Sequence, residues 1–218
     1  MRARVIISTI MAVLLVLPAL IYGRASSEAV EAKVVLQLYP YVPVEMHGVR
    51  KCPVCGFNVP DAKVKEPEGA QVLHELITKR LLATESCKFI VQDDYRDAGY
   101  YDVSDEADRI EIRELAAEKG SDAVLYPVLL RYRERVGNQF AASMPAAVAF
   151  HIYILDVEEF GMLWRGAYSE EQAPLSNNLL GFMQAYRRGF KWVKADRLIE
   201  DGLNRVFKSF PGCEALER

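Results

Sequence analysis

Two cysteines stand three positions apart in the stretch RKCPVCGFN, and this spacing is compatible with several kinds of chemistry. As metal ligands, Cys52 and Cys55 would supply half of a tetrahedral zinc site, because a closed structural site needs four donors. His47 is a candidate third ligand, and Cys87, Cys213 or a second chain could supply the fourth. The sequence requires no cofactor, and zinc is the one that these residues could hold.

The same pair of thiols could instead react or cross-link. A redox-active thiolate needs a helix N-terminus or neighbouring cations to lower its pKa. Here a Gly-Phe-Asn-Val-Pro run follows the pair, and only Arg50 and Lys51 are adjacent cations. Free thiols are a further alternative. We favour a local disulfide between Cys52 and Cys55, because the leader described below directs the chain to an oxidising compartment. Four cysteines can pair in three ways, and the sequence does not choose among them.

Basic side chains alternate along LLRYRERV and could bind a partner. A strand would place Arg131, Arg133 and Arg135 on one side, where they could dock carboxylates or phosphates. The ordinary alternative is a solvated sheet face whose charges are balanced by neighbouring glutamates. We favour this alternative, because charged rows are common on half-buried sheets.

A second candidate partner surface follows in GFMQAYRRGFKWVK, where aromatic rings lie among cations. Such a mixture suits a membrane headgroup layer or a protein partner. The apolar positions keep helical spacing, so we expect core packing for most of them. The side chains that would face a partner are Arg187, Arg188, Lys191 and Trp192.

Patterns typical of enzymes are weak in this chain. The three histidines, His47, His74 and His151, fall in three separate segments, and Asp93 and Asp94 are adjacent in sequence. Neither a nucleophile elbow nor a glycine-rich phosphate loop is present. We therefore expect a protein without catalytic activity.

The composition limits the partners of the chain. A length of 218 residues with 51% apolar content suits one medium-sized domain with a proper core. After the first 25 residues the chain carries 24 basic and 30 acidic side chains. This acidic balance argues against general nucleic-acid binding, which needs many cations to neutralise phosphates.

The first 25 residues have the layout of an export signal. A basic start is followed by an apolar run from Val5 to Ile21, with a break at Pro18. Gly23 and Ala25 favour cleavage after Ala25, and an uncleaved inner-membrane anchor is the alternative. Both interpretations predict that residues 26–218 lie in the periplasm or on the envelope.

The remaining chain alternates strand-like and helix-like segments. Period-2 apolar runs rich in Val, Ile and Tyr predict strands, and apolar residues three and four apart predict helices. We expect strands over 32–44, 87–92, 122–135, 146–159 and 161–172, and helices over 69–84, 104–120, 175–189 and 194–210. Ser104 is the expected N-cap of the second helix, and Gly120 its C-terminal stop.

The predicted order is β-α-β-α-β-β-β-α-α, which indicates one α/β domain over residues 26–218. Helices between the first strands require crossovers, and the last three strands suit hairpins. A single mixed sheet with helices mainly on one face satisfies both constraints. A loop over about 43–69 carries the two cysteines.

Part of this pattern resembles a known group of envelope proteins. The stretches AAEKGSDAVLYPVLLRYRER and AVAFHIYILDVEEFGMLWRGAYSE are similar to the periplasmic domain of the curli secretion channel and to the N-terminal domain of the Tol-associated propeller protein. The residues that carry the resemblance, over about half the chain, are Gly120, Asp122, Asp156, Gly161, Leu163 and Trp164. The chain differs in lacking a lipobox cysteine and in having the CPVCG loop. The resemblance implies an envelope assembly or accessory module.

These observations predict an exported, non-catalytic interaction module of the cell envelope. It would act by self-association or by docking to an envelope complex. One alternative is a zinc-binding or redox protein that uses Cys52 and Cys55. Another is a peripheral membrane protein that uses residues 182–194.

Overall fold

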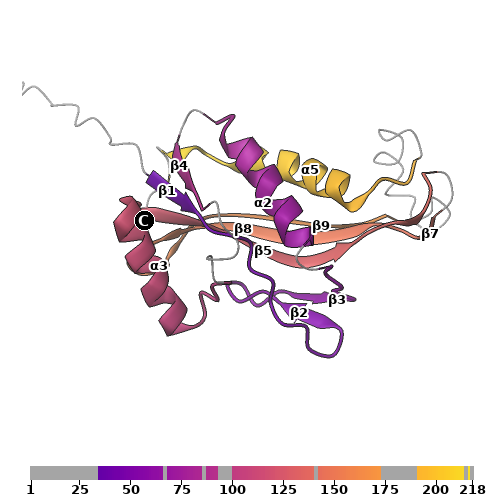
Figure 1. The fold of residues 1–218 in the computed structure, drawn as a ribbon, viewed down its shortest axis with the longest axis horizontal. Coiled ribbons are helices and arrows are strands. Elements are labelled where there is room, and N and C mark those ends of the chain that lie inside the picture. Colours follow the sequence, from indigo (N-terminus) through magenta and orange to yellow (C-terminus); the bar gives the residue numbers. More distant parts are fainter. Residues whose placement is uncertain are drawn as a thin grey trace, which may run out of the picture. The chain divides into compact units, whose positions relative to one another are not determined.

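A five-stranded sheet forms the centre of the fold (Figure 1). The computed structural model describes residues 34–65, 68–84, 87–92, 100–139, 142–172, 191–213 and 216, so the predicted leader lies outside the described residues. The strand order is β4 (Lys88–Val91), β1 (Val34–Gln37), β5 (Ala123–Arg133), β8 (Ala147–Asp156) and β9 (Met162–Glu171). Strand β1 is parallel to β4 and β5, whereas β5, β8 and β9 are antiparallel. The predicted mixed α/β sheet is confirmed.

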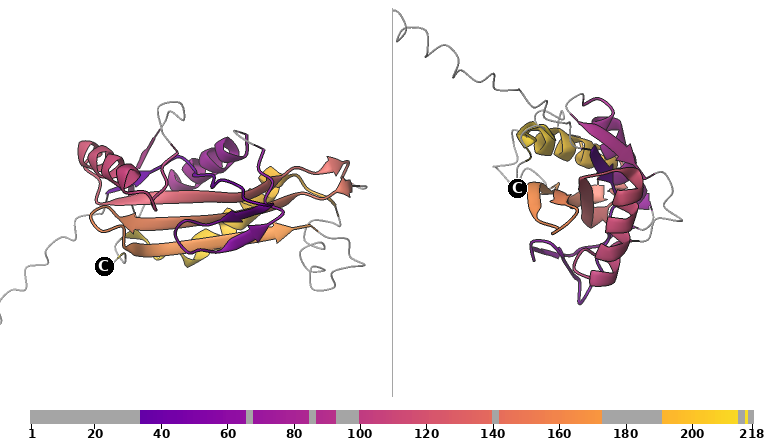
Figure 2. Two further views of the ribbon diagram at one scale, coloured as in Figure 1. Left: turned by 90° about the horizontal axis from the view of Figure 1, so that it is seen from below. Right: turned by 90° about the vertical axis from the view of Figure 1, so that its left-hand side faces the viewer.

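Three described helices pack against this sheet. They are α2 (Glu68–Leu81), α3 (Glu106–Lys119) and α5 (Ala195–Val206), which a short 3-10 turn over Phe207–Ser209 extends. Helices α2 and α5 cover one face, and α3 packs against the other (Figures 1 and 2). The predicted helix over 175–189 lies outside the described residues. None of the described helices is long and apolar enough to span a membrane.

A small hairpin occupies the segment that the sequence predicts as a loop. Strands β2 (Val49–Lys51) and β3 (Asn58–Pro60) pair antiparallel and pack on the face of the sheet that α3 also covers. A second short hairpin, β6 (Val136–Gly137) and β7 (Ala142–Met144), continues from the end of β5. The β2–β3 hairpin is the element that carries Cys52 and Cys55.

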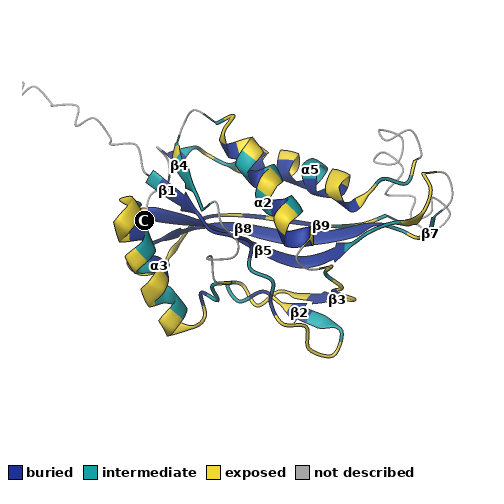
Figure 3. Cartoon of the chain, in the orientation of Figure 1, coloured by how far each residue is buried: buried dark blue, intermediate teal, exposed yellow. Residues whose placement is uncertain are grey.

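The core consists of two apolar layers, one on each face of the sheet. Leu73 and Ile77 of α2 and Leu198 and Leu203 of α5 pack into one layer. Ile112 of α3 packs into the other. Figure 3 shows that β5 and β8 are buried along nearly their whole length, because both of their faces are covered. Side chains of these two central strands are therefore held rigidly.

The two ends of α3 are fixed by capping residues, one of which the sequence predicts correctly. Gly120 is left-handed, with φ of 63°, and ends the helix as predicted. The N-cap is Asp105, not Ser104: the Asp105 carboxylate accepts hydrogen bonds from the backbone N–H groups of Ala107 and Asp108. Ser104 is unavailable because its hydroxyl donates to Asp102 Oδ1 over 2.6 Å.

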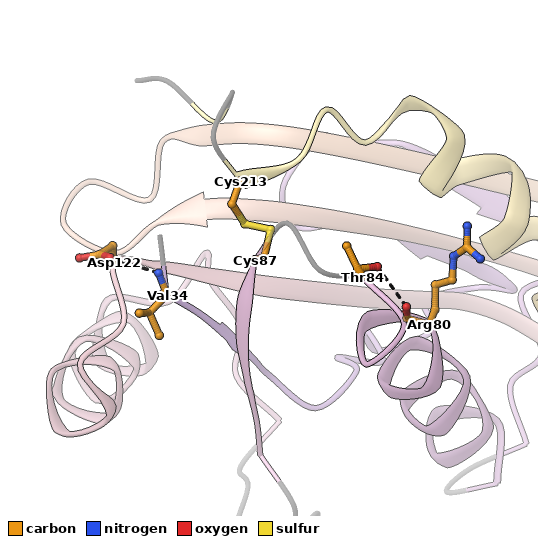
Figure 4. Close-up of a disulfide and its surroundings, with 6 residues drawn as sticks. All are labelled: Val34, Arg80, Thr84, Cys87, Asp122 and Cys213. Carbon is orange, nitrogen blue, oxygen red and sulfur yellow. Dashed lines mark hydrogen bonds between the residues drawn. A yellow bond between two sulfur atoms is a disulfide. The ribbon is translucent and has the colours of Figure 1, made fainter. Parts of the chain in front are cut away.

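A disulfide joins Cys87, directly before β4, to Cys213 near the C-terminus (Figure 4). The Cα atoms of the pair are 5.3 Å apart, a usual separation for a disulfide. Strand β4 lies at the edge of the sheet and is half-buried. The bond ties this edge to the segment after α5, 126 positions later in the chain.

Candidate functional site

The turn between β2 and β3 presents two thiols to the sheet. The backbone N–H of Gly56 donates to the Cys52 carbonyl oxygen, and Cys52 N–H donates to the Phe57 carbonyl oxygen, both over 2.9 Å. Gly56 has φ of 71°, which a residue with a side chain rarely adopts. Cys52 is buried and Cys55 is exposed.

Strand β8 supplies two polar side chains that meet these thiols. His151 and Tyr153 are two positions apart and therefore point to the same face of the sheet. His151 Nδ1 lies 3.5 Å from Cys55 Sγ and 3.0 Å from the Tyr153 hydroxyl, which is itself 3.2 Å from Cys52 Sγ. We call Cys52, Cys55, His151 and Tyr153 the thiol–imidazole cluster.

The cluster borders a cavity of about 310 Å³ between the hairpin and strands β8 and β9. Phe57 closes one side, with its ring centroid 5.6 Å from that of His151. Arg165 of β9 lines the same cavity and is the cation that acts on the cluster. Arg50, which the sequence suggests for this role, instead points away to bind the carbonyl oxygens of Pro43 and Ala62.

The two thiols have opposite electrostatic environments. Burial raises the pKa of Cys52, although hydrogen bonds from Tyr153 and from backbone N–H groups oppose this effect. Burial also disfavours the thiolate of Cys55, but hydrogen bonds from Tyr153 and the Phe57 N–H, together with the charge of Arg165, lower its pKa. Cys55 is thus the more readily ionised thiol. Burial and Arg165 lower the pKa of His151 to about 4, so its imidazole is neutral at neutral pH.

The structure corrects three expectations about the cysteines. Cys52 and Cys55 are free thiols, not a local disulfide, because both sulfurs are directed towards β8. The third polar donor near them is His151, not His47. Cys87 and Cys213 are bonded to each other, so neither can serve as the fourth ligand.

The first set of arginines does not form an open docking face. A bulge between Leu129 and Arg131 shifts the register of β5, and the strand ends at Arg133. The side chains of Arg131 and Arg133 are only 9% and 10% exposed, and both pair with Glu171. They balance acidic neighbours, as the favoured alternative expects, but their side chains are nearly buried and do not lie on a solvated face.

Arg135 instead contacts Trp192, a residue of the second candidate partner surface. Its guanidinium donates to the Trp192 carbonyl oxygen, and Trp192 N–H donates to the Gln139 carbonyl oxygen over 2.9 Å. A cavity of about 650 Å³ lies beside this contact. Among the residues that line it, we call the following the cationic surface: Arg135, Lys191, Trp192, Lys194 and Arg197. Arg187 and Arg188 lie outside the described residues.

The comparisons with known proteins assign neither a family nor a function to the chain. No protein-family model and no curated protein sequence matches the chain. Among solved structures, the chain is similar to the PelC dodecamer from Paraburkholderia phytofirmans, at 12% identity and a TM-score of 0.41, covering 85% of this chain and 88% of that one. Lipoprotein GNA1162 from Neisseria meningitidis matches at 17% identity and a TM-score of 0.40, covering 72% and 96%. The LpoB C-terminal domain from Salmonella enterica matches at 14% identity and a TM-score of 0.36, covering 66% of this chain and 87% of that one.

These similarities are too distant to assign a function. The three similar structures are of proteins other than the curli channel and the Tol-associated propeller. The residues that carry the sequence resemblance have structural roles here. Asp122 accepts a hydrogen bond from Val34 N–H over 3.3 Å, as Figure 4 shows, and Asp156 Oδ1 accepts two from the turn after β8. Trp164 Nε1 donates to the Ser209 carbonyl oxygen over 3.2 Å.

Proposed function

We propose that this protein is an exported, non-catalytic interaction module of the cell envelope that docks an acidic surface through its cationic surface. The docked surface belongs either to a second copy of the chain or to another envelope protein. The observation that carries the proposal is the gathering of Arg135, Lys191, Lys194 and Arg197 around one cavity.

The arrangement of this surface suits docking. Lys191 and Lys194 are exposed, and among the described residues neither forms an ion pair. Their backbone is fixed, because Val193 N–H donates to Gln172 Oε1 over 3.1 Å and Arg135 holds the Trp192 carbonyl oxygen. The half-buried Trp192 and the neighbouring Arg135 and Arg197 are of residue types that protein-binding surfaces favour.

Two further features support export from the cytoplasm and a second copy of the chain as the partner. A disulfide such as Cys87–Cys213 is typical of chains that fold outside the cytoplasm, in agreement with the predicted leader. The chain after residue 25 is itself acidic, so a second copy offers the complementary charge. The membrane alternative involves residues 182–194, of which 182–190 lie outside the described part of the chain.

A charge-reversal experiment tests the proposal. The full chain would be expressed with its leader, and its oligomeric state and cross-linked envelope partners would be compared with those of the double variant Lys191→Glu/Lys194→Glu. We expect the wild-type protein to self-associate or to retain an acidic envelope protein, and the variant to lose this contact. The matched control, Lys119→Glu/Lys208→Glu, makes the same change in charge elsewhere and should behave like the wild type. A monomeric wild-type protein without a partner, or a reversed variant that binds unchanged, would overturn the proposal.

A further inference from the structure

We infer that Cys52, Cys55 and His151 form a zinc site, a property that goes beyond the proposed docking function. The candidate ligand atoms of these three residues all lie within 4.8 Å of one another. Two cysteines spaced as C-x-x-C and one histidine from a distant strand are a ligand set that zinc commonly takes in proteins.

The distances in the cluster suit a tetrahedral ion. With Zn–S of about 2.3 Å and Zn–N of about 2.0 Å, a tetrahedral site separates sulfur from nitrogen by about 3.5 Å. Cys55 Sγ and His151 Nδ1 are 3.5 Å apart. One edge of the tetrahedron is thus already formed, and Cys52 Sγ, at no more than 4.8 Å from the others, needs only a small shift.

Hydrogen-bond donors around the sulfurs support bound thiolates. Backbone N–H groups of Val54 and Cys55 are directed at Cys52, and the Phe57 N–H is directed at Cys55. The Tyr153 hydroxyl lies 3.2 Å from Cys52 Sγ and would orient the ligands from the second layer. Hydrogen bonds from these donors would stabilise the negative charge of a pair of metal-bound thiolates.

The position of His151 favours a metal over a disulfide. A Cys52–Cys55 disulfide would leave His151 Nδ1 its hydrogen bond with the Tyr153 hydroxyl over 3.0 Å, but would make no use of its 3.5 Å approach to Cys55 Sγ. His151 is only 7% exposed, and it is held from a central strand that is covered on both faces. Three ligands leave the fourth position to water or an anion from the adjacent cavity, where Arg165 would favour negative charge.

The test measures bound zinc in the full chain, purified under reducing conditions and then incubated with zinc and dialysed. We expect one zinc per chain in the wild type and in His47→Ala, and a loss of bound zinc in Cys55→Ser and His151→Gln. Cys55 is exposed, so the Cys55→Ser variant should fold normally. The double variant Cys87→Ser/Cys213→Ser removes two sulfurs without touching the site and should keep the ion.

Cobalt provides a second measurement on the same proteins. Tetrahedral cobalt bound by two thiolates gives a sulfur-to-metal charge-transfer band, which should weaken in Cys55→Ser and persist in His47→Ala. Wild-type protein that retains no zinc, or zinc retained equally by Cys55→Ser or by His151→Gln, would overturn the ligand set. Because Lys191→Glu/Lys194→Glu leaves the cluster intact, a failure here is distinguishable from a failure of the docking proposal.

Discussion

Gly202 of α5 lies directly against the ring of Tyr168 in β9. A Cβ atom placed on Gly202 would be 2.4 Å from Tyr168 Cδ1, which is closer than any real contact of that kind. Gly166 makes the matching approach from the sheet, where a Cβ would be 2.1 Å from Val206 Cγ1. The two glycines therefore set how closely α5 packs on the sheet.

In the Gly202→Ala variant, the gain in helix propensity opposes the loss from overpacking α5 against β9. Propensity alone would stabilise the helix by about 1 kcal/mol, whereas overpacking costs about 1–3 kcal/mol. We expect a net loss of up to about 2 kcal/mol in the free energy of unfolding, measured by urea denaturation. Gly161→Ala is the control, because a Cβ there meets nothing within 4 Å. A Gly202→Ala protein more stable than the wild type would contradict the close packing.

The buried arginines lead to a prediction about stability. Arg133 pairs with Asp61 and Glu171, each over 2.5 Å, and its Nε donates to the Pro145 carbonyl oxygen over 3.2 Å. Arg133→Ala would remove a nearly buried cation from two carboxylates that are themselves about half exposed. We expect a loss of about 1–2 kcal/mol in chemical denaturation, from the lost charged hydrogen bonds.

The exposed Arg197, which pairs with Glu200 over 2.7 Å, provides the comparison for Arg133. Arg197→Ala should cost less than about 1 kcal/mol, because exposed ion pairs contribute little. Equal losses in the two variants would show that burial does not distinguish them.

The sequence predicts the regular elements well, because their signals are local. The apolar stripe of α5, the Gly120 stop and the long strands β5, β8 and β9 are all periodic patterns or single-residue signals within one element. The arginine row fails as a docking face, because a bulge and the ion pairs with Glu171 depend on neighbouring strands.

The thiol–imidazole cluster shows what local patterns leave out. Cys55 and His151 are 96 positions apart, and no periodicity in either segment indicates that they meet. The alternation of β8 does place His151 and Tyr153 on one face, which is a usable signal once the hairpin is known to cover that face. The pairing of Cys87 with Cys213 is equally non-local, since it depends on where α5 ends over the sheet.

The disulfide should contribute strongly to stability. Cross-linking two residues 126 positions apart restricts the unfolded chain, and removing such a bond typically costs about 2–5 kcal/mol. We expect Cys87→Ser/Cys213→Ser to lower the melting temperature, and a reductant to lower that of the wild type equally while leaving the double variant unchanged. Peptide mapping without reduction should recover the Cys87–Cys213 pair. An unchanged melting temperature on reduction would contradict a stabilising bond.

Asp102 makes part of the stability dependent on pH. Its carboxylate accepts hydrogen bonds from the Tyr41 hydroxyl over 2.7 Å and from Ser104 N–H over 2.9 Å. Burial opposes the charge, but the bonds from Ser104 and Tyr41 outweigh it and hold the pKa of Asp102 below its usual value. The unfolded chain therefore takes up a proton first as the pH falls below about 4, and the folded state loses this stabilisation through the lower pKa of Asp102. Asp102→Asn should cost about 1 kcal/mol at pH 7 and less near pH 3, as measured by urea denaturation at both values. An equal cost at the two pH values would show that the charge of Asp102 contributes nothing to the fold.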